Sequence, residues 1–206
     1  KIVTIDGEDA VGKKVTNEYV AEHLRGKKGT KVLLGIKRGK SDELIEFEVV
    51  RDKIPLNSID AAFMLDKNIG YIKLDRFAQT SMTEFEESLA KLKAQKMKSL
   101  VLDLRGNTGG YLNIAVELSN QFLKNDMTIV YTEGDKSPKQ IFKTDRNGKF
   151  TDGKLVVLID EGSASASEIV SGAVQDWDRG VLIGRRSFGK GLVQRPFNLP
   201  DGSVVR

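Results

Sequence analysis

Short apolar strands alternate with amphipathic helices from residue 68 onward, and this alternation constrains the fold more than any other feature of the sequence. The predicted strands lie at residues 68–74, 100–104, 128–131, 155–159, 181–183 and 192–197. The predicted helices lie at residues 81–92, 114–122 and 169–177. Because apolar strands separated by helices are typical of parallel sheets, the sequence predicts an α/β layered fold with a largely parallel sheet.

The first 50 residues follow a different, strand-rich pattern. Alternating apolar residues predict strands at residues 1–5, 31–37 and 44–50, and apolar residues at helical spacing predict a short helix at 17–25. A turn is predicted at residues 39–42 and a linker at 55–58. We therefore expect a small β-rich domain over residues 1–53 and an α/β core over residues 54–206.

Two local signals refine the core. Ser81 and Glu84 have the spacing of a capping box, which predicts the start of a helix. Asn147-Gly148 follows a short apolar stretch at 141–144 and predicts the turn of a β-hairpin.

The chain contains no Cys and a single His, His23. Without thiols there is no cysteine nucleophile, no disulfide and no Cys-ligated metal, and one imidazole excludes a multi-His metal centre. Acid–base chemistry must therefore fall mainly to Lys, Asp, Glu or Tyr. We expect His23 to be a surface or groove residue and expect no metal site.

Charge and hydropathy exclude two further classes. The 33 Lys and Arg residues exceed the 29 Asp and Glu residues by +4, and the excess is spread along the chain instead of forming a basic patch for nucleic acid. The longest uninterrupted apolar run is Leu155–Ile159, whereas a membrane-spanning helix needs about 20 apolar residues. The sequence predicts neither nucleic-acid binding nor a membrane span.

The first candidate for chemistry is the segment 160–168, between a predicted strand and a predicted helix. Small side chains there leave room for a substrate beside the positive end of the helix. Of its three serines, Ser165 lies four and eight residues before Ile169 and Ala173, so it heads the inward-facing stripe. Ser165 is the best-placed nucleophile. Because Ser165 and Glu168 are also spaced as a capping box, a purely structural role stays open.

The second candidate is Lys190, which Gly189 and Gly191 flank on a permissive loop next to Phe188. A lysine is a base only when neutral. Working near pH 7 would require its pKa to fall by about 3 units from the usual value of about 10.4. The spacing of the glycines does not fit a phosphate-binding loop, and a solvent-facing turn is the structural alternative.

The third candidate is the segment 103–110, which follows the predicted strand at 100–104. Ligands of α/β proteins gather at the carboxyl ends of strands, and glycines there allow backbone N–H groups to approach a developing oxyanion. Gly109 and Gly110 are the candidates. An ordinary strand–turn–helix connection is the alternative.

Together these segments resemble the C-terminal processing peptidases, also called tail-specific proteases. The resemblance rests on the run 163–169 (Ser-Ala-Ser-Ala-Ser-Glu-Ile), on Gln175-Asp176, on 188–191 (Phe-Gly-Lys-Gly) with Gln194, and on 103–110. Residues 1–8 are similar to the second half of that family's PDZ domain. The family implies a crotonase-like core, a PDZ domain and a Ser/Lys serine endopeptidase activity.

By this resemblance Ser165 is the nucleophile, Lys190 is the general base and Gln194 assists the lysine. The backbone N–H of Ala166, together with that of Gly109 or Gly110, would form the oxyanion hole. Contact between Gln194 and Lys190 would require the chain to turn near Gly191, because four residues of straight strand span about 13 Å.

Asp176 also matches the family's pattern. It lies 11 residues after Ser165, or about 16 Å along a helix, so it cannot touch the nucleophile. We expect it to order the end of the helix or to pair with Arg185 or Arg186.

The resemblance further implies that the partners are C-terminal tails of polypeptides, that no cofactor is needed, and that the protein works in the bacterial cell envelope or periplasm. The carboxylate-capturing half of the PDZ domain would precede Lys1, and the core would extend past Arg206. Two alternatives stay open: a catalytically silent module that binds tails, and a crotonase-type acyl-CoA enzyme, which would give no reason to pair Ser165 with Lys190.

Overall fold

The computed structural model describes residues 1–206 except 13–14, 40–42, 54–56, 195 and 206. Most of the predicted turn at 39–42, half of the predicted linker at 55–58 and one residue of the predicted strand at 192–197 fall outside the described residues. The chain divides into two compact units, Lys1–Leu56 and Asn57–Arg206.

The first unit is a four-stranded antiparallel sheet with one helix. The strand order is β2-β1-β3-β4, and α1 (Asn17–Leu24) is the helix. The strands are β1 (Ile2–Ile5), β2 (Glu8–Asp9), β3 (Lys31–Ile36) and β4 (Ile45–Val50). The Arg51 guanidinium donates to the carbonyl oxygens of His23 and Leu24 at 2.9 and 2.8 Å and so satisfies the carboxyl end of α1. The predicted helix and the three predicted strands are confirmed.

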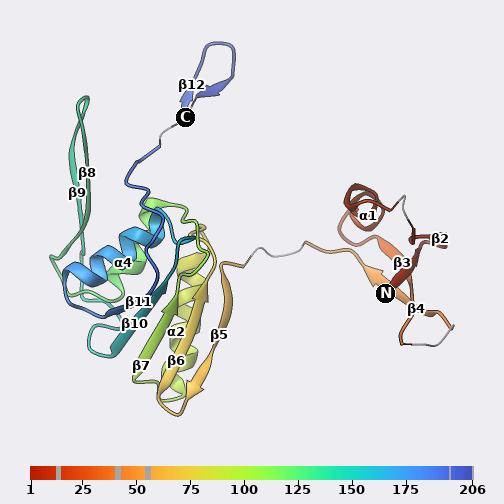
Figure 1. The fold of residues 1–206 in the computed structure, drawn as a ribbon, viewed down its shortest axis with the longest axis horizontal. Helices are drawn as coiled ribbons and strands as arrows, with labels where there is room; N and C mark the ends of the chain where they lie inside the picture. Colours follow the sequence, from red (N-terminus) through yellow and green to blue (C-terminus); the bar gives the residue numbers. More distant parts are fainter. Residues whose placement is uncertain (13–14, 40–42, 54–56, 195, 206) are drawn as a thin grey trace. The chain divides into compact units, whose positions relative to one another are not determined.

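The second unit is built around a five-stranded sheet with the order β11-β10-β7-β6-β5 (Figure 1). Four neighbouring strands are parallel, and β5 pairs antiparallel at one edge. The strands are β5 (Ile59–Asp66), β6 (Ile69–Leu74), β7 (Ser99–Asp103), β10 (Lys154–Ile159) and β11 (Val181–Gly184). The prediction of a mixed α/β fold with a largely parallel sheet is confirmed for this unit, but β5 was not predicted.

Three helices pack together with one face of this sheet. They are α2 (Ser81–Ala94), α3 (Leu112–Asn120) and α4 (Ala166–Asp176). Apolar residues at helical spacing meet the inward residues of the strands, and the largest fully buried side chains include Phe77, Phe85, Phe122, Leu102 and Leu104. Burying a side chain of this size contributes about 1.5–3 kcal/mol, so the packing of these helices against the sheet is a large source of stability for the second unit.

A long hairpin of β8 (Thr128–Gly134) and β9 (Ser137–Lys143) extends from the body of the second unit beside α4 (Figure 1). Its turn lies at residues 135–136, so the predicted hairpin at Asn147-Gly148 is wrong. Asn147 instead accepts the backbone N–H of Asn125 at 3.0 Å, and Gly148 donates to the carbonyl oxygen of Leu123 at 3.0 Å. These two residues close a loop against the segment after α3.

The predicted capping box at the start of α2 is also wrong. The Glu84 carboxylate accepts the backbone N–H groups of Ser58 and Ile59 at 2.7 and 2.9 Å. The Ser81 hydroxyl donates to the hydroxyl of Ser58 at 2.7 Å. Ser58 is fully buried by these contacts, so it belongs to the folded second unit and not to a linker.

The predicted strand at 192–197 is not formed as such. Among its described residues only Phe197 is in a strand, where β12 (Phe197–Asn198) pairs with β13 (Val204–Val205). Across the described part of the chain, no helix is both long and apolar enough to cross a membrane.

Candidate active site

Ser165 lies between β10 and α4 in a strained backbone conformation. Its φ of 56° and ψ of −112° are unusual for a residue with a side chain, and such conformations cost on the order of 1–3 kcal/mol. The backbone N–H of Ser165 donates to Glu168 Oε2 at 2.8 Å, and the predicted capping box of Ser165 and Glu168 is present. The side chain is half-buried and lines a cavity of about 490 Å³. Strain held in place beside a cavity is common at functional sites.

The other two serines of the segment serve the packing. The buried Ser163 hydroxyl donates to the Leu104 carbonyl at 2.8 Å and accepts the N–H of Asp160 at 3.0 Å. The buried Ser167 hydroxyl donates to the Asn107 carbonyl at 2.8 Å. Ser165 is therefore the serine of this segment that is left to face a ligand.

Lys190 lines the same cavity as Ser165 although 25 residues separate them. It lies on the loop after β11, and its side chain is half-buried. Its Nζ donates to Gln194 Oε1 at 3.3 Å, which is the contact that required a turn near Gly191. Within the described residues no hydrogen bond joins Lys190 Nζ to Ser165 Oγ, so proton transfer between them needs a closer approach when substrate binds.

The candidate oxyanion residues surround Ser165. Gly109 has a φ of +99°, and a β-carbon there would lie 2.8 Å from Ser165 Cβ, so only glycine fits. Its N–H donates to Asn107 Oδ1 at 2.9 Å and is thus engaged. In the described part of the chain, the N–H groups of Gly110 and Ala166 have no hydrogen-bond acceptor.

The sequence analysis missed Asn107, which joins the two loops around Ser165. It is fully buried, and its Nδ2 donates to the Leu74 carbonyl at 2.8 Å. Its own carbonyl accepts the N–H of Ala164 at 3.0 Å as well as the Ser167 hydroxyl. Because one side chain and one peptide group make all these bonds, the loop at 104–110 and the start of α4 form one rigid body. An asparagine before two glycines was the available signal.

Glu168 is a second missed residue, because the sequence indicated only its capping role. Its carboxylate also accepts the Ser187 hydroxyl at 2.8 Å and the N–H groups of Gly189 and Lys190 at 2.7 and 2.9 Å. Burial raises the pKa of Glu168, but these hydrogen bonds outweigh burial and leave the pKa below its ordinary value. The carboxylate is therefore ionised near neutral pH.

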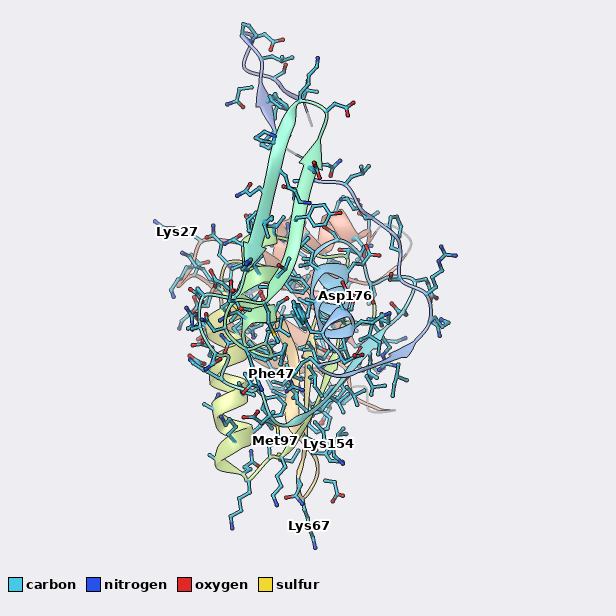
Figure 2. All side chains as sticks on the ribbon, turned by 90° about the vertical axis from the view of Figure 1, so that its left-hand side faces the viewer. Lys27, Phe47, Lys67, Met97, Lys154 and Asp176 are labelled. Carbon is cyan, nitrogen blue, oxygen red and sulfur yellow. The ribbon has the colours of Figure 1, made fainter. Side chains whose placement is uncertain are left out.

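Asp176 lies at the last turn of α4, beside the β8–β9 hairpin, and lines the cavity (Figure 2). The expected ion pair with Arg185 is wrong, because Arg185 pairs with Glu161 through two bonds of 2.6 and 3.0 Å. Among the described residues Asp176 has no hydrogen-bond or ion-pair partner. Its carboxylate is exposed at the end of the cavity remote from Ser165.

The walls of the cavity are largely apolar. One wall is four consecutive residues of β8, from Thr128 to Tyr131, and the other is the face of α4 that carries Ile169 and Ala173. Gly172 of α4 also lines the cavity, and a β-carbon at this position would meet nothing within 4 Å. Glycine inside a helix costs about 0.5–1 kcal/mol relative to alanine, and here no close packing requires it.

Asp103, the first residue of the third candidate segment, is a buried carboxylate that forms an ion pair with the partly exposed Arg105. Its carboxylate accepts Arg105 Nη2 and the Tyr71 hydroxyl, each at 2.6 Å. Burial raises the pKa of Asp103, but these bonds dominate and hold it at about 2, while burial and the neighbouring carboxylate raise the pKa of Tyr71 to about 12. Asp103 thus anchors the start of the loop that carries Asn107.

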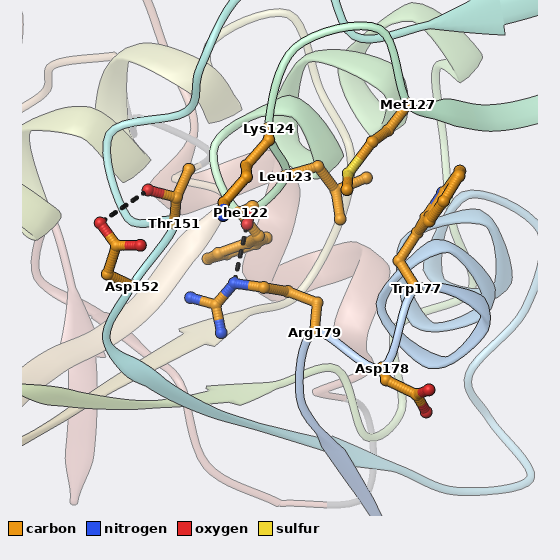
Figure 3. Close-up of a pocket in the computed structure, with 9 residues that line it drawn as sticks. All are labelled: Phe122, Leu123, Lys124, Met127, Thr151, Asp152, Trp177, Asp178 and Arg179. Atoms are coloured by element: carbon orange, nitrogen blue, oxygen red, sulfur yellow. Dashed lines mark hydrogen bonds between the residues drawn. The ribbon is translucent and has the colours of Figure 1, made fainter.

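A second cavity of about 380 Å³ lies behind Trp177, which lines both cavities (Figure 3). Trp177 Nε1 donates to the Thr128 carbonyl at 2.7 Å and so ties α4 to β8. Arg179 donates to the carbonyl oxygens of Phe122 and Phe150 at 2.8 and 2.6 Å, and burial lowers its pKa. These bonds make the second cavity part of the scaffold that holds the end of α4.

His23 is engaged within the first unit. Its ring stacks on Tyr19 with centroids 3.9 Å apart, and Nδ1 lies 2.7 Å from the Tyr19 carbonyl oxygen. Over the residues that the structure describes, His, Asp and Glu side chains nowhere gather in a group of three that could hold a metal ion.

The second unit thus defines an α/β protein in which a strained serine at a helix N-terminus and a lysine-bearing loop face one cavity. The model of peptidase family S41 matches residues 68–206. The chain is 40% identical over 206 residues to a carboxyl-terminal-processing protease of Picosynechococcus, covering 98% of this chain and 49% of that protein. It is 36% identical to the carboxy-terminal processing protease CtpA of Bacillus subtilis, covering 100% of this chain and 43% of that protein.

The solved structure of a photosystem II D1 C-terminal processing protease is also similar. It matches with a TM-score of 0.64 and 28% identity, covering 98% of this chain and 55% of that one. The chain belongs to peptidase family S41, which confirms the family that the motifs indicated. It spans about half the length of these relatives.

Proposed function

We propose that this chain carries the catalytic site of a serine endopeptidase that cleaves polypeptides near their C-terminal tails through an acyl-enzyme. The observation that supports this most is that Ser165 and Lys190, from distant parts of the sequence, line one cavity. Membership of peptidase family S41 supports the same reaction class. Ser165 is the nucleophile, Lys190 the general base, and Gln194 holds the amine.

In the first half of the reaction, neutral Lys190 Nζ takes the proton from Ser165 Oγ as the oxygen attacks the scissile carbonyl carbon. The carbonyl double bond becomes a single bond to an oxyanion. The protonated amine then gives its proton to the departing nitrogen, and the C–N bond breaks to leave a serine ester. Water repeats the sequence on the ester, which releases the acid and restores Ser165.

For the oxyanion we propose the N–H groups of Ala166 and Gly110. Both lack an acceptor among the described residues, whereas the N–H of Gly109 is bonded to Asn107. Donors that are fixed before the reaction stabilise a developing charge without reorganising, and the positive end of α4 adds to the effect. Gly109 then serves to let the backbone approach Ser165.

We propose that the substrate lies along β8 and α4 in an extended form. Its side chains would meet the apolar wall of Ile169 and Ala173 and the space above Gly172, while Asp176 marks the far end of the cavity. An extended chain advances about 3.3 Å per residue. The 16 Å of helix between Ser165 and Asp176 would therefore accommodate about five substrate residues.

The finer features of the fold and setting belong to the same proposal. Residues 1–53 form part of a PDZ domain, and residues 54–206 form a crotonase-like peptidase core. The four-stranded sheet with α1 and the parallel sheet with its three helices support this division. The partners are C-terminal tails of polypeptides. We place the protein in the bacterial cell envelope or periplasm, which follows from the family resemblance alone.

The test compares the chain with Ser165→Ala on a peptide with a free carboxyl end, using mass spectrometry of the products. We expect cleavage by the natural sequence and a loss of at least about 10³-fold in the variant, with unchanged thermal unfolding. Ser137→Ala, an exposed hydroxyl on the hairpin, is the control and should cleave normally.

A silent tail-binding module is the alternative, and an active-site fluorophosphonate separates the two. The endopeptidase should be labelled at Ser165, whereas a module that only binds tails should hold the peptide without being labelled. Affinity for CoA esters without labelling would favour the crotonase-type alternative.

A further inference from the structure

The loop that carries Lys190 is attached to α4 by one carboxylate. Glu168 accepts four hydrogen bonds of 2.7–2.9 Å, three from Ser187, Gly189 and Lys190 and one from the N–H of Ser165. An ionised carboxylate offers about four acceptor positions, so these donors fill it. The same side chain therefore contacts the backbone of the proposed nucleophile and the backbone of the proposed base.

The rest of the loop has little else to hold it. Residues 185–194 contain neither helix nor strand, and Phe188, Leu192 and Val193 are 68%, 77% and 55% exposed. Over the described residues 187–191, the backbone bond to the body besides those of Glu168 runs from Phe188 N–H to the Ser163 carbonyl at 3.0 Å. Because its apolar side chains are exposed, hydrophobic packing would not hold this loop against α4 without the Glu168 carboxylate.

Bonds to an ionised acceptor are stronger than neutral ones, and leaving several backbone donors unpaired is costly. The Glu168 bonds are also divided evenly between the two carboxylate oxygens, each of which accepts two donors. Oε1 accepts Ser187 and Gly189, and Oε2 accepts Ser165 and Lys190. Oε2 thus sets the separation between the two backbone positions from which Oγ and Nζ extend.

We propose that Glu168 is a positioning residue: its carboxylate clasps the loop 187–190 to the N-terminus of α4 and thereby sets where Lys190 lies relative to Ser165. This rests on the proposed function of those two residues. Glu168 lines the same cavity, but its carboxylate is filled by these four donors, and over the described residues no hydrogen bond joins it to the lysine amine. Its loss should reduce the turnover number and leave substrate binding, which the walls of the cavity provide, nearly unchanged.

The experiment compares Glu168→Gln with the unaltered chain by hydrogen exchange of the backbone amides and by peptide cleavage. Glutamine keeps the volume of the side chain but has one acceptor oxygen in place of two. We expect the amides of Gly189 and Lys190 to exchange at least 10-fold faster while those of α4 from Ile169 on stay protected. We expect kcat to fall at least 10-fold and KM to change less than twofold. Glu117→Gln, an exposed position on α3, is the control.

Ser187→Ala is a second, milder variant that tests the same contact if Glu168→Gln does not fold. It removes one donor from the loop and leaves the cap on Ser165 intact, so we expect a two- to fivefold loss of kcat with KM and thermal unfolding unchanged. Unchanged exchange of Gly189 and Lys190 in Glu168→Gln would overturn the clasp. Faster exchange with unchanged kcat would overturn the positioning role.

The outcome stays separate from that of the proposed function. If the unaltered chain cleaves the peptide and Lys190→Ala does not, the endopeptidase assignment holds whatever Glu168 does. If the unaltered chain is inactive, hydrogen exchange still decides whether Glu168 holds the loop.

Discussion

The two halves of the proposed catalytic site are built in different ways. The loop at 104–110 and the start of α4 are joined by buried groups, with Asn107 and Ser163 bonded across both segments. The loop at 185–194 lies at the surface, and over residues 187–191 it is held by the Glu168 carboxylate and by one backbone bond from Phe188 to Ser163. The proposed nucleophile and oxyanion donors are thus held by buried bonds of the fold, whereas the proposed base lies on a surface loop that the Glu168 carboxylate attaches to α4. Apart from Ser165 itself, substitutions at the buried bonds of the first half should lower stability, and substitutions in the loop at 185–194 should lower turnover.

The largest stability effect should come from Asn107→Ala. The substitution leaves the Leu74 carbonyl and the Gly109 N–H buried without partners, at about 1–3 kcal/mol each. We expect the free energy of unfolding to drop by about 2–4 kcal/mol, measured in urea. Asn68→Ala, at a strand end, is the comparison and should change stability by less than 1 kcal/mol. Equal effects at the two positions would show that the Asn107 bonds do not stabilise the buried half.

A smaller, pH-dependent effect should come from Asp103, which anchors the same buried half. Its pKa of about 2 in the folded chain lies below its ordinary value of 3.8, so ionisation favours the folded state. The contribution, about 1–2 kcal/mol, is fully present above about pH 4 and is lost as the pH falls toward 2. The gap in unfolding free energy between the natural sequence and Asp103→Asn should therefore narrow by this amount between pH 6 and pH 2. A gap that does not depend on pH would contradict the account.

The smallest stability effect should come from Gln194→Ala in the base loop. Gln194 is exposed, and its single bond to Lys190 Nζ is long at 3.3 Å. We expect the free energy of unfolding to change by less than about 0.5 kcal/mol and kcat to fall a few-fold. Gln140→Ala on the hairpin is the matched control. A loss of stability comparable with that of Asn107→Ala would show that the base loop is part of the core.

The sequence analysis did better on the first half than on the second. Spacing at i, i+4 and i+8 from Ser165 identified the serine that faces the cavity, because a helix repeats its face over short distances. The capping box indicated one bond of Glu168, but its other three partners lie 19–22 residues further on, and no local pattern encodes such contacts. The Asn107 contacts were missed for the same reason.

Two of the differences between the predicted and the observed fold have related causes. The strand β5 mixes half-buried and exposed apolar residues with acidic ones at its ends, so its periodicity is weak. Asn147-Gly148 has the chemistry of a hairpin turn, but the long hairpin forms at residues 135–136. Gly148 is needed where the backbone of Asn120 and Gln121 approaches too closely for a β-carbon. In both cases contacts between distant parts of the chain, and not the local sequence pattern, determine the structure.

If Lys190 activates Ser165, the rate at which a fluorophosphonate labels Ser165 depends on the lysine amine. Lys190→Met keeps the length of the side chain and removes the amine, while Lys136→Met in the exposed hairpin turn serves as the control. We expect labelling of Ser165 to slow at least about 10²-fold in Lys190→Met and to be unchanged in the control. Equal labelling rates in the natural sequence and Lys190→Met would contradict it.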